Sequence, residues 1–290
     1  MMQLVFEKYQ NSSEDFRAFM FEIINEKYSI YKEKLTDCTR KMSDDNVHNL
    51  RVSSRRFLSV LNLYKQFYPT LYFSMISKMV KKNFKNMGRL RDVQVMIENC
   101  QLLKIQFPII YDFINYLLTN EKKIITNFSQ GITDININEL DGMMYFLIHI
   151  LKYDFPEIKH NFSAFEIFLD DKLKSLRTLY NQITPTNSKT IHKFRIAVKK
   201  YRYVIEILQD FVPDYKQLYK RLVRIQDRAG EIQDLAVLIN EFEIFANKKG
   251  YATDELNLQK ANIIDFLKNK QQQQIADFLN DSAEINSIFE

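Results

Sequence analysis

The chain has 290 residues, of which only 5 are glycine and 5 are proline. β-Sandwiches, barrels and Rossmann-type folds use these residues at many tight turns, so this composition excludes them and favours long helices with few connections. An apolar fraction of 46% is enough for a sizeable core. The net charge of +5, spread evenly, would say little about partners.

Apolar residues recur at helical spacing along nearly the whole chain, which predicts an all-α protein. In chain order, helices are expected at about residues 14–38, 45–66, 70–103, 107–128, 142–152, 157–182, 188–211, 214–247 and 252–280. Turn chemistry marks breaks at 43–46, 129–138 and 184–188. The first and third of these breaks end in residues that make good N-caps.

The compartment signals favour a cytoplasmic protein that is not bound to a membrane. The first residues include Glu7 and no long apolar run, so no signal peptide is expected. The longest apolar stretch, near 143–151, is too short to span a bilayer. Two cysteines, Cys38 and Cys100, suit a reducing cytosol and form neither a disulfide framework nor a metal site by spacing, although a single pairing stays open.

An internal repeat organises the chain. Residues 47–57 match residues 191–201 at an offset of 144, and Gly88–Val93 matches Gly230–Leu235 in the same order. We therefore expect one domain made of two similar helical bundles, about residues 1–140 and 141–290, related by a pseudo-two-fold axis. Because glycine is unfavourable inside a helix, its recurrence suggests a close helix crossing or a kink.

The repeated helix carries a basic stripe with apolar residues on both sides. The stripe consists of His48, Arg51 and Arg55 in the first copy and of His192, Arg195, Lys199 and Arg202 in the second. On a helical projection the stripe lies between the main core face (Val47, Leu50, Phe57, Leu61 and Ile191, Phe194, Tyr201, Ile205) and a smaller strip (Val52, Leu63 and Ile196, Ile207). A stripe with this flanking pattern is expected to line a groove and to need an anionic partner. The alternative is a solvated face on which acids such as Glu206 supply salt bridges.

Charge is strongly segregated along the chain. Residues 46–65, 78–91, 189–202 and 216–228 together carry +20, which leaves −15 on the rest. Basic residues precede the glycine motif at equivalent positions of the repeat. They are Lys78 and Lys82 before Gly88 in the first half and Lys220 and Arg224 before Gly230 in the second. The acids that follow the glycines, Asp92 and Asp234, are expected either to orient a neighbouring arginine or to form ordinary surface ion pairs.

The pattern His48-x-x-Arg51-x-x-x-Arg55-Arg56, its counterpart from His192 to Tyr203, and the two Gly-x-x-x-Asp elements resemble the CHAD family (conserved histidine α-helical domain). The resemblance covers nearly the whole chain. It implies a basic central groove or pore that binds inorganic polyphosphate, and it extends to association with polyphosphate granules. Two departures stand out: Leu58 replaces a frequent base, and Gln233 replaces arginine. No ExExK strand motif of a fused CYTH triphosphatase is found, so the chain resembles a stand-alone module.

Carried over by position, the resemblance implies polyphosphate contacts in both copies of the repeat. The first-rank contacts are His48, Arg51, Arg55, Arg56, His192, Arg195, Lys199, Lys200 and Arg202. The second-rank contacts are Lys78, Lys82, Lys220 and Arg224, with Asp92 and Asp234 in support.

Three functions remain open from the sequence. The first is non-catalytic binding of polyphosphate or another polyanion. The second is a phosphohydrolase acting on polyphosphate or a nucleotide, although no phosphate-binding loop, HExxH or CxxC motif or carboxylate cluster for Mg²⁺ is found, so we expect no enzyme, metal or cofactor. The third is a nucleic-acid-binding module, which we disfavour because a narrow groove would exclude a duplex.

Overall fold

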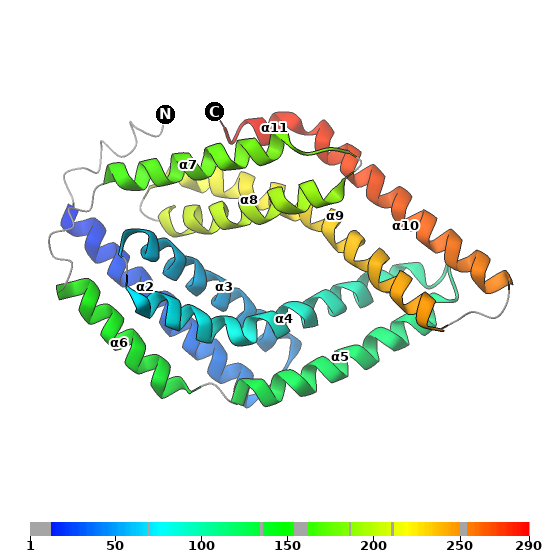
Figure 1. The fold of residues 1–290 in the computed structure, drawn as a ribbon, viewed down its shortest axis with the longest axis horizontal. Coiled ribbons are helices and arrows are strands. Elements are labelled where there is room, and N and C mark those ends of the chain that lie inside the picture. The colour runs from blue at the N-terminus through cyan, green and yellow to red at the C-terminus, as the bar shows by residue number, and fades with distance from the viewer. Residues whose placement is uncertain are drawn as a thin grey trace. The chain divides into compact units, whose positions relative to one another are not determined.

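The computed structural model describes residues 13–68, 70–133, 136–153, 162–185, 187–209, 212–249 and 254–289, and its regular structure within these ranges is entirely α-helical (Figure 1). The predicted all-α fold is therefore confirmed. None of the described helices combines the length and the apolar character needed to cross a membrane. The helices are α2 (Ser13–Arg40), α3 (Asp44–Phe67), α4 (Leu71–Leu103), α5 (Ile110–Thr133), α6 (Ile137–Tyr153), α7 (Phe162–Asn181), α8 (Ser188–Leu208), α9 (Tyr215–Lys249), α10 (Asp254–Asn280) and α11 (Ser282–Asn286).

Side-chain caps begin the helices that carry the basic stripe. The hydroxyl of Ser43 accepts a hydrogen bond from the backbone N–H of Asn46 at 3.3 Å, at the start of α3. The side chain of Asn187 accepts from the N–H of Lys189 at 3.1 Å, beside the start of α8. Both caps satisfy N–H groups that have no partner inside the helix. The predicted starts at 45 and 188 lie within a residue of the observed ones, but the capping residues are Ser43 and Asn187 and not the last residues of the expected breaks.

The break expected at 129–138 is wrong in its extent, because α5 continues to Thr133 and α6 begins at Ile137. The oxygen of the Asn136 side chain accepts from the N–H of Glu139 at 3.2 Å and therefore caps α6. Gly142 lies inside α6, where a Cβ would meet open space. The expected helix starts at 157 and 252 and the helix end at 211 lie outside the described residues.

The chain forms two compact units, each assembled from three segments. Unit 1 comprises Met1–Gly88, Thr126–Leu173 and Lys200–Tyr219, and unit 2 comprises Arg89–Ile125, Lys174–Lys199 and Lys220–Glu290. The boundaries fall inside α4, α5, α7, α8 and α9, so the units follow packing rather than chain order. The two sequence repeats stay a prediction.

The core of unit 1 fixes the face of α3 that is turned inward. The fully buried ring of Phe57 contacts Tyr28 and Tyr31 of α2, with ring centroids 5.4 and 5.5 Å apart. The two histidine helices are α3, which carries His48, and α8, which carries His192. Their predicted core residues are buried: Val47, Leu50, Phe57, Leu61, Ile191, Phe194, Tyr201 and Ile205. Because this face is buried at helical spacing, the basic residues between its members lie elsewhere on the helix surface.

Unit 2 has a core of its own, to which α4, α5, α9 and α10 contribute. Phe113 of α5 meets Phe242 of α9 edge to face at a centroid distance of 5.2 Å, and Ile263 and Leu267 of α10 belong to the same cluster. Replacing a buried phenylalanine such as Phe113 by alanine costs about 3–5 kcal/mol.

Candidate polyanion-binding surfaces

The basic stripe of α3 lies against α4 within unit 1. The guanidinium of Arg55 lies over the ring of Phe84, 5.4 Å from its centroid. The Nη1 atom of Arg51 lies 3.9 Å from the point where a Cβ on Gly88 would stand. His48, at the start of α3, is exposed. Two of the stripe's charges are thus held half-buried against a helix that is itself basic.

The stripe of α8 makes a matching contact within unit 2. The Nε and Nη2 atoms of Arg195 lie 3.5 Å from the point where a Cβ on Gly230 of α9 would stand. His192, one turn earlier on α8, is half-buried. Each unit therefore places the first arginine of its histidine helix beside the motif glycine.

These contacts show which group lies nearest to each motif glycine. The group that approaches Gly88 and Gly230 most closely is an arginine side chain, and the distances of 3.5–3.9 Å are those of ordinary van der Waals contact. The atoms of other residues nearest to each Cβ position belong to an arginine side chain and not to a backbone. The close helix crossing or kink expected at these glycines stays a prediction.

Several polar atoms on the two histidine helices are buried without a hydrogen-bond partner among the described residues. They include the Nε of Arg55, the Nε of Arg195 and the Nδ1 of His192, which belong to predicted contacts, and also the hydroxyl of Tyr201. An unsatisfied buried polar atom costs about 1–3 kcal/mol, and more when the group is charged. A bound anion would offset this cost by supplying counter-charge beside the same guanidinium groups.

One carboxylate connects two of the predicted contacts in unit 1. The Nε of Arg56 lies 2.6 Å from Oε1 of Glu206, and the Nη1 of Arg202 lies 3.4 Å from Oε2 of the same residue. Arg202 also donates to the hydroxyl of Tyr219 at 3.1 Å and lies over the ring of Tyr203. For Arg56 and Arg202, the structure therefore agrees with the alternative in which Glu206 supplies salt bridges. These two arginines and the one carboxylate together carry a net charge of +1.

The arginines of α9 in unit 2 contact the C-terminal helices. Arg224 pairs with Glu284 of α11 at 2.5 Å, and Arg228 pairs with Asp281. Arg221 donates to the backbone carbonyl of Ser287 at 3.1 Å. Protein acceptors therefore already occupy one basic face of α9.

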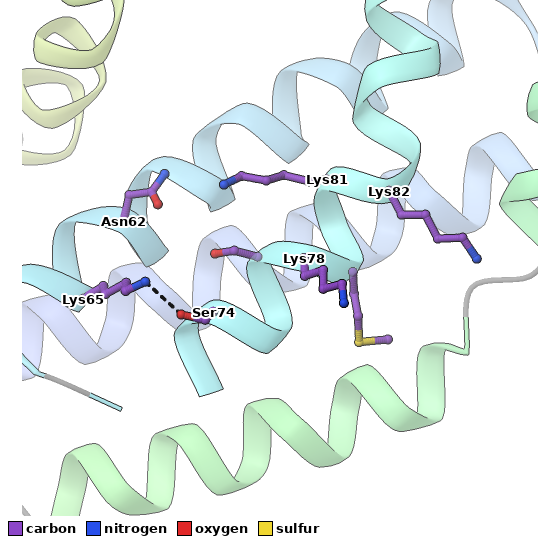
Figure 2. A pocket seen from close by; sticks show the side chains of 8 residues that line it. Asn62, Lys65, Ser74, Lys78, Lys81 and Lys82 are labelled. Atoms are coloured by element: carbon purple, nitrogen blue, oxygen red, sulfur yellow. Dashed lines mark hydrogen bonds between the residues drawn. The ribbon is translucent and has the colours of Figure 1, made fainter. Parts of the chain in front are cut away.

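A hollow of about 740 Å³ opens between α3 and α4 within unit 1 (Figure 2). Its labelled cations are Lys65 of α3 and Lys78, Lys81 and Lys82 of α4. Lys65 donates to the hydroxyl of Ser74 at 2.8 Å. The other lining residues are Asn62, Ser77 and Met79. We call this site the lysine pocket.

The remaining predicted residues lie as follows. Lys200 is exposed on α8 within unit 1, Lys220 is exposed on α9 within unit 2, and Lys199 is half-buried on α8 within unit 2. Of the supporting acids, both within unit 2, Asp92 is exposed on α4 and Asp234 is half-buried on α9. The smaller apolar strip is only partly buried, since Leu63 and Ile207 are buried but Ile196 is 39% exposed.

Sequence reasoning missed Lys65 and Asn62 as site residues and left Lys81 out of the contacts. A signal for Asn62 was present, because it follows His48 by 14 residues, and fourteen steps of 100° return it to the angle of Arg51 and Arg55. The pairing of Arg224 with Glu284 had no such signal, since 60 residues separate the partners. Across the described ranges, no group of His, Cys, Asp and Glu side chains is suited to hold a metal ion.

Comparison with known proteins identifies the fold and the family. A search of curated proteins found no match. Among solved structures, the chain is similar to the crystal structure of the CHAD domain from the plant Ricinus communis, with a TM-score of 0.70 and 16% sequence identity over 93% of this chain and 91% of that one. At this identity the likeness shows the fold alone. The family model of the CHAD domain matches residues 31–108 and 150–243, which contain both histidine helices and both glycine motifs, and the chain therefore belongs to the CHAD domain family.

Proposed function

We propose that this protein binds inorganic polyphosphate without hydrolysing it, through the basic helices of its two units. Membership of the CHAD family is consistent with a polyphosphate-related role. The observation that carries the proposal is the set of buried polar atoms without a partner on Arg55, Arg195 and His192. These groups lie on the two helices that the sequence singles out by their repeated pattern.

The chemistry of the ligand matches these groups. Polyphosphate carries a regular row of negative charges with oxygen acceptors on every unit. A guanidinium offers several N–H donors in a fixed plane, and a half-buried charge interacts with phosphate more strongly than one in open water. Arg55 and Arg195 provide such groups, one in each unit. That the basic helices line one central groove stays a prediction from the sequence.

A calorimetric titration with long-chain polyphosphate at two salt concentrations tests binding. Because each neutralised phosphate releases counterions, the affinity is expected to fall steeply as salt rises from about 50 to 200 mM. No binding near about 50 mM salt would overturn the proposal. Competition with RNA and duplex DNA at matched phosphate concentration tests the preference, and preferential binding of nucleic acid would also overturn it.

The non-catalytic part of the proposal has its own assay. Release of phosphate is measured from polyphosphate and from ATP, with and without Mg²⁺, over a time in which binding is complete. We expect no release above the buffer control. Turnover that scales with protein concentration and is lost in the Arg55→Gln/Arg195→Gln variant would replace binding by hydrolysis as the function.

The proposal places the protein in the cytoplasm, at polyphosphate granules. A fluorescent fusion is expected to coincide with polyphosphate stain in cells that accumulate granules. It is expected to become diffuse when the accumulated polyphosphate is degraded. A fusion that stays diffuse in granule-rich cells would contradict this location.

A further inference from the structure

The lysine pocket brings four lysines together in the lining of one hollow. Lys65, Lys78, Lys81 and Lys82 make no ion pair with any residue in the described part of the chain. In the close-up of Figure 2, Lys81 extends towards the Asn62 side chain on α3, while Lys65 is bonded to Ser74. Ammonium groups from two helices therefore line one hollow.

The arrangement carries an electrostatic cost within α4 itself. Lys78, Lys81 and Lys82 are spaced at i, i+3 and i+4, and like charges at these spacings on one helix repel each other. No described acid lines the pocket to relieve this repulsion. A multivalent anion in the hollow would relieve it, whereas a singly charged one would leave most of it in place.

The corresponding stretch of α9 shows that such compensation is available in this fold. There Lys220 is exposed, but Arg224 and Arg228 pair with acids near the C-terminus. Lys78 and Lys82 of α4, by contrast, are the residues that the sequence repeat aligns with Lys220 and Arg224. The α4 lysines of the pocket therefore lack the compensation that Arg224 and Arg228 have on α9.

We propose that the lysine pocket binds the terminal phosphate group of an oligo- or polyphosphate. An internal phosphate carries one negative charge, whereas a terminal phosphate has a second ionisation with a pKa near 6 and carries about −1.5 to −2 at pH 7, like a phosphorylated side chain. The end of the chain is therefore the part that gains most from a hollow lined by four lysines. This inference deepens the proposed function and rests on it for the identity of the ligand.

The residue types in the pocket support an end site rather than a track along the chain. Lysine presents a compact charge with three rotatable donors, which suits a terminal PO₃ group that is free to turn. The hydroxyls of Ser74 and Ser77 and the amide of Asn62 add uncharged hydrogen-bonding groups to the lining. The arginines on α3 and α8 instead offer the planar donors that suit successive internal phosphates.

The test uses the full chain and the double variant Lys65→Gln/Lys81→Gln, which leaves the predicted contacts of the two repeats intact. The matched control is Lys123→Gln/Lys270→Gln, which removes the same charge from exposed positions on α5 and α10. The probes are inorganic tripolyphosphate, long-chain polyphosphate, and the same long chain with both ends blocked as phosphoramidates. Circular dichroism and urea unfolding confirm that each variant is folded.

We expect the pocket variant to weaken binding of tripolyphosphate by roughly ten- to a hundred-fold, as the loss of charged hydrogen bonds predicts, and the control variant to change it far less. We also expect the affinity of the pocket variant for long-chain polyphosphate with free ends to equal the affinity of the wild type for the chain with blocked ends.

Equal weakening by the two variants, or equal weakening of open and blocked chains by the pocket variant, would overturn the end site. If the wild type binds the open and the blocked long chains alike, the end site fails and the proposed function stands. If the wild type binds tripolyphosphate through the pocket but no long chain, the proposed function fails and the pocket remains a phosphate site.

Discussion

The guanidinium of Arg195 lies against the motif residue Gly230, with its Nε and Nη2 atoms 3.5 Å from where a Cβ would stand. In the other unit, Nη1 of Arg51 lies 3.9 Å from the equivalent point on Gly88. In both units the arginine belongs to the histidine helix, and the glycine belongs to the long helix that follows it in the chain. The contact connects the two sequence motifs by geometry, because the nearest neighbour of each glycine is an arginine side chain of the preceding repeated helix.

Replacing Gly88 or Gly230 by alanine is therefore expected to be tolerated. The added methyl would stand at ordinary van der Waals distance from the arginine. Since alanine is favoured over glycine inside a helix, each variant should be more stable by up to about 1 kcal/mol. Urea unfolding followed by circular dichroism measures this change. A loss of more than about 1 kcal/mol would show that the arginine cannot shift and that glycine is required by packing.

The carboxylate of Glu206 is expected to restrain two arginines at once. In the Glu206→Gln variant, Arg56 and Arg202 lose their charged partner, so the free energy of unfolding should fall by about 1–3 kcal/mol. Because the change also removes a negative charge beside two predicted contacts, polyphosphate affinity at low salt should rise. Urea unfolding and calorimetry on one preparation measure both effects. An unchanged stability, or a weaker affinity in folded protein, would contradict this role of Glu206.

The two cysteines are free, buried thiols. Burial raises the pKa of Cys38 to about 11 and the pKa of Cys100 to about 12. A thiol reagent such as DTNB should therefore react with neither cysteine at pH 8 in the native protein and with both in denaturant, because the thiolate is the reacting form. Rapid modification of the native protein at pH 8 would contradict the burial of these side chains.

The raised pKa values of Cys38 and Cys100 predict that the free energy of unfolding falls at alkaline pH. A thiol whose pKa is higher in the folded than in the unfolded state stabilises the fold fully below the unfolded pKa, near about 8.5. That contribution is lost as pH rises towards 11 and 12. Burial also raises the pKa of Tyr31, Tyr64 and Tyr201, which adds to the same trend. The urea midpoint should therefore fall above about pH 9, and a rise there would contradict the assignment.

Features set by local sequence were predicted well, and those set by distant contacts were not. The starts of α3 and α8 were predicted to within a residue, because caps act over a few residues. The capping residues, however, are Ser43 and Asn187 and not Asn46 and Ser188, at which the expected breaks end. Asn136 is a cap of the same kind, and it was missed because it lies inside the stretch 129–138 that was expected to be a break. The pairing of Arg224 with Glu284 depends on how α9 and α11 dock, which no periodicity reveals.

The lysine pocket illustrates the same limit at the candidate site. Its residues on α4 were visible as a basic run, but Lys65 lies ten residues beyond Arg55 on α3 and off the angle of the stripe. Only the packing of α3 on α4 brings Lys65 to Ser74 and thus to the α4 lysines. The sequence therefore identified the helices that carry the basic residues. Which of these residues form ion pairs and which stay unpaired depends on tertiary contacts that the sequence pattern does not reveal.

The central claim is that the arginines of the two histidine helices bind polyphosphate. It is tested most directly by titrating long-chain polyphosphate into the wild type, the Arg55→Gln/Arg195→Gln variant and the Lys123→Gln/Lys270→Gln control at low salt. We predict that the arginine variant loses roughly ten- to a hundred-fold in affinity for each arginine and has a shallower salt dependence, while the control stays near the wild type. Equal affinities for the arginine variant and the control would contradict the claim.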